Sequence, residues 1–219
     1  MDLEYSEEHV QFRETVKEFL KGWPLTGAEA KLPMEEQERI FRERGIEAGY
    51  VYRAVPKQYG GSEQPRDAIK DQIIREEFYL AKAPRDLSSQ GAGLLVPTLL
   101  EFGTEEQKAT WQERLASGTG GFTFGITESA HGSDATHMET TGVRDGDDWV
   151  LNGEKSWNTG IHKASHSMVM ARTSGQPGDG HGITAFLTPT DSPGFQLEEM
   201  LWTFNMPTDH GRFTLNHVR

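Results

Sequence analysis

The sequence predicts an α+β protein in which an all-α helical domain, residues 1–119, precedes a small antiparallel β-barrel domain, residues 120–219. Three features lead to this prediction. Up to about Ser117, apolar residues recur at helical spacing between capping signals. After Gly118, apolar and polar residues alternate over short segments, as they do in half-buried strands. Glycine and proline separate these segments at intervals typical of small barrels and sandwiches.

The first three helices are expected over about 6–22, 33–45 and 66–83. Ser6 is followed by two glutamates, which is typical of an N-cap with an acidic first turn. In the third helix, the positions expected to face inward are Ile69, Ile73 and Phe78.

Two further helices are expected before the β domain. One contains the apolar run from Leu94 to Phe102 and ends at Gly103. The next begins with the capping box Thr104-Glu105-Glu106-Gln107 and continues through Trp111 and Leu115. Helices joined by short links are expected to pack as a bundle.

The β domain is expected to consist of short strands and tight turns. Phe122, Phe124 and Ile126 alternate with polar or small residues. Asp145-Gly146 predicts a hairpin turn, and Asn152-Gly153 repeats the same signal. Further strands are expected at 167–172, 183–187, 195–197 and 213–218, with a surface loop at 174–182.

Composition excludes several classes of protein. The formal net charge of −12 argues against a nucleic-acid partner. The chain has no cysteine, which excludes disulfides, cysteine-ligated zinc and iron–sulfur clusters and suits a reducing cytoplasm. No secretory signal and no membrane-spanning apolar run is readable. The mean hydropathy of −0.64 is polar, yet a chain of 219 residues can still bury a core.

Two segments carry the residue types of a ligand site. In 124–134, a strand delivers Thr127 to a loop with Gly132 and Ser133, whose small size lets backbone N–H groups approach a phosphate or carbonyl. In 152–160, Trp157 is able to pack against a flat ring. Taken singly, the first segment also suits an ordinary turn between strands, and Trp157 a barrel-core aromatic.

Taken together, the two segments resemble the acyl-CoA dehydrogenases, FAD enzymes that oxidise the α,β bond of acyl-CoA thioesters. The matching pieces are Thr127-Glu128 with Gly132-Ser133-Asp134, and Leu151-Asn152-Gly153-x-Lys155-x-Trp157-x-Thr159-Gly160. Weaker support comes from Tyr59-Gly60-Gly61, from residues 102–108 and from the last four residues, Asn216 to Arg219. The resemblance extends over nearly the whole chain and implies the helical and middle β domains of that family.

The resemblance implies a role for each matching residue. Phe124, Ile126 and Thr127 are expected against the flavin, and Gly132 and Ser133 at the FAD pyrophosphate. Ser133 is also expected to contact the pantetheine arm of the substrate. Trp157 is expected to cover one face of the isoalloxazine, and Thr159 to reach its N5, where fixed hydrogen bonds tune the flavin.

The sequence departs from the family at two places and stops short at a third. Ser129-Ala130-His131 stands where the family often has proline, and His210-Gly211 stands where well-studied members often have Thr-Arg. The family also has a third, helical domain with the glutamate base, expected to begin where this sequence ends. We therefore assign no catalytic residue, since Glu128 is not at the base position. The resemblance implies that these 219 residues, tested alone, are inactive and bind FAD poorly.

Other candidates are weaker. His162 and His166 are four residues apart but lack a third ligand, so no metal site is predicted. Lys155 is expected to lie at the surface.

The resemblance implies an oxidoreductase acting on CH–CH groups in fatty acid metabolism. It implies an acyl-CoA or another acyl thioester as substrate, an electron-transfer flavoprotein as electron acceptor, and a homo- or hetero-oligomer in the cytoplasm. Two alternatives stay open. One is a flavin oxidase or monooxygenase of the same fold. The other is a non-catalytic fragment or partner subunit of a flavoprotein complex.

Overall fold

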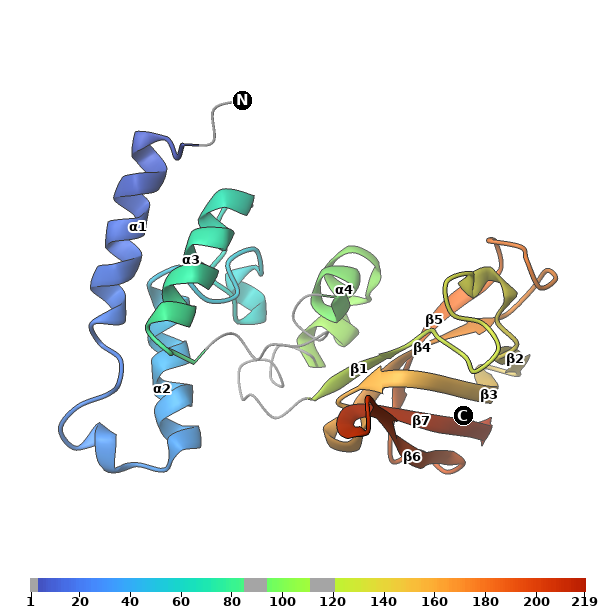
Figure 1. The fold of residues 1–219 in the computed structure, drawn as a ribbon. Helices are drawn as coiled ribbons and strands as arrows, with labels where there is room; N and C mark the ends of the chain where they lie inside the picture. Colours follow the sequence, from blue (N-terminus) through green and yellow to red (C-terminus); the bar gives the residue numbers. More distant parts are fainter. Residues whose placement is uncertain (1–3, 85–93, 111–120) are drawn as a thin grey trace. The chain divides into compact units, whose positions relative to one another are not determined.

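The computed structural model describes residues 4–84, 94–110 and 121–219. The chain divides into two compact units. We call Met1–Ser88 with Val96–Thr119 the helical unit, and Ser89–Leu95 with Gly120–Arg219 the β unit. The predicted fold class, a helical region followed by a β-sheet domain, is confirmed (Figure 1).

Six helices of the helical unit have both ends among the described residues. They are α1 (Glu7–Leu20), η1 (Glu29–Lys31), α2 (Met34–Glu47), η2 (Lys57–Tyr59), α3 (Ala68–Leu80) and α4 (Val96–Phe102). Two of them, α1 and α3, begin at a side-chain N-cap. The Ser6 side chain accepts a hydrogen bond from the backbone N–H of His9, as its predicted N-cap role requires. Asp67 caps α3 in the same way, through the N–H groups of Ile69 and Lys70.

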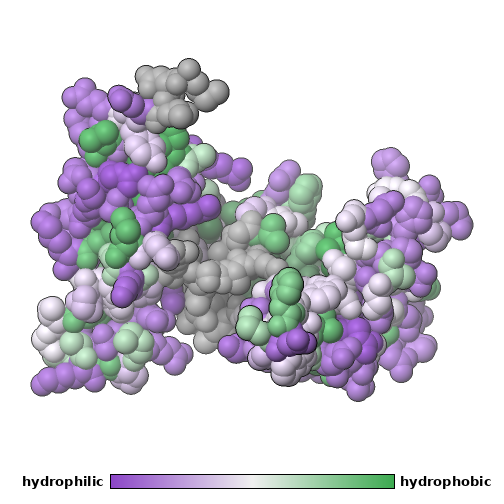
Figure 2. Space-filling model, in the orientation of Figure 1, coloured by the Kyte–Doolittle hydropathy of each residue, from purple (hydrophilic) through white to green (hydrophobic). Residues whose placement is uncertain are grey.

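An aromatic cluster forms the core of the helical unit. The ring of Phe41 lies 5.2 Å from that of Phe19, 5.0 Å from Trp23 and 6.0 Å from Phe78, centroid to centroid. Ile73 of α3 is also fully buried. On the face shown in Figure 2, hydrophilic residues cover most of this unit, and hydrophobic residues are visible as separate patches.

The structure corrects one detail of the predicted helices and confirms another. Ile69 was expected to face inward but is 44% exposed, because it occupies the first turn of α3, ahead of the buried face that begins at Ile73. The capping box is confirmed, since Thr104 and Gln107 each accept a hydrogen bond from the other's backbone N–H. Trp111 and Leu115, expected in that helix, lie outside the described residues.

Replacing Ser6 by alanine is expected to lower the free energy of unfolding of the helical unit by about 1 kcal/mol, because a first-turn N–H of α1 loses its acceptor. Chemical denaturation followed by far-UV circular dichroism measures this loss. Ser6→Thr keeps the acceptor and serves as the control. Equal stabilities of the alanine and threonine variants would contradict the prediction.

The β unit is one seven-stranded sheet in which neighbours follow the order β1-β4-β2-β3-β7-β6, with β5 paired to β4. Its strands are β1 (Phe122–Gly125), β2 (Thr141–Asp145), β3 (Asp148–Thr159), β4 (His166–Arg172), β5 (Ile183–Pro189), β6 (Phe195–Thr203) and β7 (Met206–Val218). Most pairs are antiparallel, as expected, but β1 and β2 each run parallel to β4. Parallel pairing of β1 with β4 is possible because the β2–β3 hairpin lies in the long connection between them, whereas β2 and β4 pair only at Thr141 and Arg172.

Two turn and strand predictions changed in detail. The β2–β3 hairpin forms at Gly146 as predicted, but the second turn, predicted at Asn152-Gly153, is wrong: β3 continues through it, with a register shift against β7 between Leu151 and Gly153. A Cβ on Gly153 would lie 2.5 Å from the Thr140 hydroxyl oxygen, and its φ is +145°. The glycine therefore serves a close approach of Thr140 rather than a turn. Strands β6 and β7 also extend beyond the predicted segments, into a hairpin whose exposed residues show no alternation.

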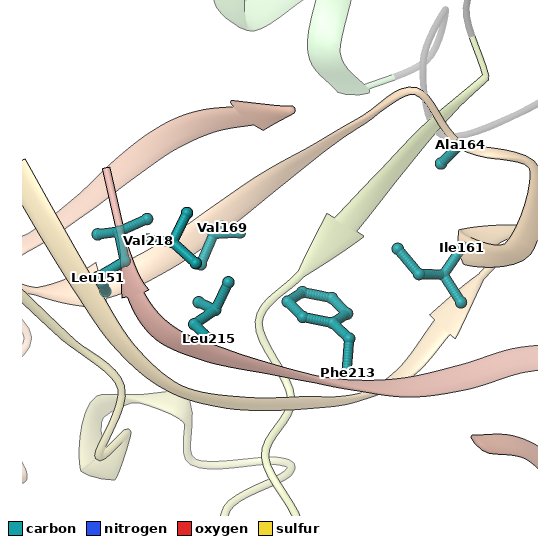
Figure 3. Packing of buried hydrophobic residues seen from close by; sticks show 8 residues of the cluster. Leu151, Ile161, Ala164, Val169, Phe213, Leu215 and Val218 are labelled. Carbon is teal, nitrogen blue, oxygen red and sulfur yellow. The ribbon is translucent and has the colours of Figure 1, made fainter. Parts of the chain in front are cut away.

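The core of the β unit lies between β3, β4 and β7 (Figure 3). Phe213 is fully buried there and stacks on Phe195 at a centroid distance of 4.4 Å. The other buried members are Leu151, Ile161, Ala164, Val169, Ala171, Leu215 and Val218. Strands β3 and β7 lie side by side (Figure 1), and this pair carries the second of the two sequence motifs.

Candidate functional site

The two sequence motifs lie against each other in the β unit. Strand β1 ends at Gly125, and the backbone continues alongside β3. The N–H of Ser156 donates to the carbonyl of Thr127 at 2.8 Å. The Lys155 ammonium donates to the carbonyl of Ile126 at 3.2 Å. The structure therefore brings Ile126 and Thr127 next to the segment that carries Trp157.

A buried ion pair fixes this contact. The Nζ of Lys155 lies 2.8 Å from Oε1 of Glu128, and the two side chains are 0% and 4% exposed. The Glu128 carboxylate also accepts hydrogen bonds from the N–H groups of Glu139 and Thr140, at 2.6 and 2.9 Å. The expected surface position of Lys155 is therefore wrong. Lys155 shares strand parity with the buried Leu151, which places its side chain on the core face of β3.

The hydrogen-bond donors around the Glu128 carboxylate favour its charged form. Burial alone would raise its pKa, but the hydrogen bonds from Lys155, Thr140 and Glu139 outweigh burial and lower it. Burial lowers the pKa of Lys155, and the Glu128 carboxylate opposes that shift. Lys155 and the two backbone donors together anchor residues 126–128 beside β3.

A β-bulge turns Trp157 out of the core. Along the β3–β7 ladder, Lys155 pairs with Phe213 and Asn158 with Gly211, so β3 has one residue more than β7 between these pairs. Trp157 has a φ of +62°, and its side chain leaves the core face that Lys155 occupies. Trp157 is 49% exposed, whereas Asn158 is 1% exposed and donates through Nδ2 to the Gly211 carbonyl. Trp157 is thus not a core aromatic.

Thr159 lies beyond the bulge and faces β7. It pairs with His210, and its hydroxyl oxygen lies 3.0 Å from Nδ1 of the imidazole. The Trp157 and His210 rings meet edge to face at a centroid distance of 6.2 Å. Trp157, Thr159 and His210 therefore form one cluster at this end of β3, in which His210 was not predicted as a site residue.

Gly132 and Ser133 lie on an exposed loop that is anchored to the same strands. Ser129 donates its N–H to Glu154 Oε1 at 3.1 Å, and reciprocal backbone hydrogen bonds join Glu128 and His131. A Cβ built on Gly132 meets no atom within 4 Å, so open space adjoins its backbone. The described contacts do not join Gly132 or Ser133 directly to Trp157 or Thr159. Phe124 lies half-buried in β1, paired with Met168 of β4.

Within the described part of the chain, no group of three or more histidine, cysteine, aspartate or glutamate residues is placed to hold a metal ion. His162 lies in the short helix η5 (Ile161–Lys163), and His166 begins β4, so they share no helical face.

Comparison with known proteins gives the family. The acyl-CoA dehydrogenase N-terminal domain matches residues 6–119, and the middle domain of the same family matches residues 123–218. A probable acyl-CoA dehydrogenase of Bacillus subtilis, YngJ, is 38% identical over 204 residues, which cover 90% of this chain and 52% of that protein.

Solved structures also resemble this chain. The ChsE4–ChsE5 complex of Mycobacterium tuberculosis matches with a TM-score of 0.73 and 27% identity, covering 100% of this chain and 55% of the other. A glutaryl-CoA dehydrogenase of Mycobacterium smegmatis in complex with FADH2 matches with a TM-score of 0.67 and 27% identity, covering 98% and 54%. The chain spans about half the length of the relatives it matches. Over that span it belongs to the acyl-CoA dehydrogenase family.

Proposed function

We propose that the β unit binds FAD and that the chain serves in an acyl-CoA dehydrogenase, an oxidoreductase that acts on the α,β bond of an acyl thioester. The observation that carries this proposal is the half-exposed indole of Trp157, which the bulge turns outward beside Thr159. A residue with positive φ and a large exposed ring is unusual in a strand, and such features gather at ligand sites.

The residues present fit a flavin. The Trp157 ring offers an apolar face for a flat ring system, and Thr159 offers a hydroxyl two residues further along the same strand. Ile126 and Thr127 lie against Ser156, the residue before Trp157. Gly132 and Ser133 have exposed backbone that suits the pyrophosphate, with Ser133 also proposed at the substrate's pantetheine arm.

When bound, FAD would accept the hydride that leaves the β-carbon of the thioester. The chain's own residues would position the ring and hold Thr159 at its edge. Glu128 does not serve as the base in this proposal, because Lys155 and two backbone N–H groups already occupy its carboxylate. We assign no base among the described residues.

The proposed partners follow from the relatives. We propose an acyl-CoA or another acyl thioester as substrate and an electron-transfer flavoprotein as electron acceptor. Assembly with another copy or another chain is supported by the matched ChsE4–ChsE5 structure, which is a complex of two proteins. No helix in the described ranges is long and apolar enough to cross a membrane.

Titration of the isotope-labelled chain with a large excess of FAD tests the proposed site, since these 219 residues alone are expected to bind FAD only weakly. We expect amide resonances of Thr127, Thr159 and the Gly132 loop to shift, together with the indole N–H of Trp157. Resonances of the helical unit's aromatic core, such as Phe41, serve as the internal control. Shifts absent from the β unit, or confined to residues far from Trp157, would contradict an FAD site here.

A further inference from the structure

His210 contacts the residue that the proposed flavin site uses as its hydroxyl. Its Nδ1 lies 3.0 Å from Thr159 Oγ1, across the β3–β7 pair. The backbone N–H of His210 donates to Thr208 Oγ1 at 3.2 Å, which helps to fix the residue. The Asp209 carboxylate lies 3.7 Å from Nδ1. The hydroxyl and the carboxylate therefore both lie near the same ring nitrogen, Nδ1.

A hydroxyl has one proton, so this contact decides what Thr159 can offer to a ligand. If Nδ1 carries a proton, it donates to Oγ1, and the hydroxyl proton is free to point elsewhere. If Nδ1 is bare, Thr159 donates to it, and only the lone pairs of Oγ1 face the ligand. The nearby Asp209 carboxylate favours an N–H at Nδ1 by charge–dipole attraction.

We propose that His210 is a positioning residue that keeps Thr159 a hydrogen-bond donor toward the flavin, an inference that rests on the proposed FAD site. A fixed donor suits oxidised flavin, whose N5 accepts a hydrogen bond, better than reduced flavin, whose N5 carries a proton. His210 thereby sets the relative affinity for the two redox forms of the cofactor, without contacting the flavin itself.

The first test needs no flavin. In the isotope-labelled chain, Thr159→Val is expected to shift the Nδ1 resonance of His210, because the valine removes its hydrogen-bond partner. His166, whose Nδ1 lies 3.1 Å from the Ser165 hydroxyl in the same unit, is the control and should not respond. An unchanged His210 resonance overturns the inference, whatever the chain does with FAD.

The second test is a double-mutant cycle on the affinities for oxidised and reduced FAD. His210→Phe is expected to favour reduced FAD by about tenfold in the ratio of the two Kd values, about 30 mV for a two-electron couple. His210→Asn places an amide near Nδ1 and is expected to restore most of the ratio. In the Thr159→Val background, His210→Phe should have no further effect.

The outcomes of these tests distinguish the positioning role of His210 from the proposed FAD site. An equal effect of His210→Phe with and without the Thr159 hydroxyl overturns the positioning role while leaving the FAD site intact. Failure of the chain to bind FAD at Trp157, with the His210–Thr159 hydrogen bond present by NMR, contradicts the proposed function, and the flavin-tuning role fails with it.

Discussion

Replacing Lys155 by methionine is expected to lower the free energy of unfolding of the β unit by about 3–5 kcal/mol. Methionine fills a volume close to that of the lysine stem, so the loss comes mainly from the charge. Without Lys155, the Glu128 carboxylate stays buried with only the N–H donors of Glu139 and Thr140. Breaking a buried pair at one partner leaves an uncompensated charge, the costly case.

Urea denaturation monitored by the fluorescence of the β unit's tryptophans measures this loss. Lys163→Met is the matched control, since Lys163 is exposed in the same unit and its replacement is expected to change stability by less than about 0.5 kcal/mol. The double variant Lys155→Met with Glu128→Gln is expected to recover part of the loss, because no unpaired charge remains. A Lys155→Met chain as stable as the Lys163→Met chain would contradict the pair's proposed role.

The pair also links folding to the candidate site. Lys155 bonds the Ile126 carbonyl as well as Glu128, so its loss is expected to loosen the segment that presents Thr127. Any Lys155 variant should therefore be judged on stability before its flavin affinity is interpreted.

The sequence predicted the elements with local signals. Ser6 and the Thr104–Gln107 box mark helix starts through side-chain hydrogen bonds to nearby N–H groups, and both form as expected. The β2–β3 hairpin follows from Gly146, which adopts a φ of +66°. Such signals act over a few residues and do not depend on the rest of the fold.

The wrong predictions occur where tertiary contacts determine the local structure. Asn152-Gly153 carries the dipeptide of a tight turn, yet the glycine is used for the close approach of Thr140. The burial of Lys155 depends on Glu128, a residue 27 positions away along the chain. The spacing of Lys155 from Leu151, which puts both on one face of a strand, was the one local signal that Lys155 points inward. The general preference of lysine for the surface outweighed that signal in the prediction.

The flavin roles of the candidate residues stay predictions, and the sequence did not indicate their geometry. The structure places the two motifs against each other, with Trp157 and Thr159 of the second motif on one strand, β3. Nothing in the sequence indicates the bulge at Ser156 and Trp157, and without it Trp157 would share the inward face of Lys155. The sequence marked His210 only as a departure from the family pattern, and its contact with Thr159 was not predictable, because a cross-strand pair depends on the register of β3 and β7.

Replacing Trp157 by alanine is expected to weaken FAD binding by about 1–3 kcal/mol, the range found when an aromatic that stacks on a flat base is removed. That loss corresponds to about 5- to 150-fold in Kd. Stability should change little, because the ring is 49% exposed. Alanine, like tryptophan, carries a Cβ, so the strain of the positive φ is similar in the two residues. The contrast with Lys155, two positions earlier on the same strand, is a consequence of the bulge.

Titration of the chain with FAD, followed by the quenching of flavin fluorescence, measures the affinity. Trp202→Ala is the matched control, because Trp202 is also exposed in the β unit, at 66%, but lies on β6, which contains neither motif. Trp157→Phe should retain much of the affinity, since a smaller ring can still stack. If Trp157→Ala and Trp202→Ala bind FAD with the parent's affinity, the indole does not cover the flavin. If both lose affinity equally, FAD binds exposed aromatic residues without a defined site.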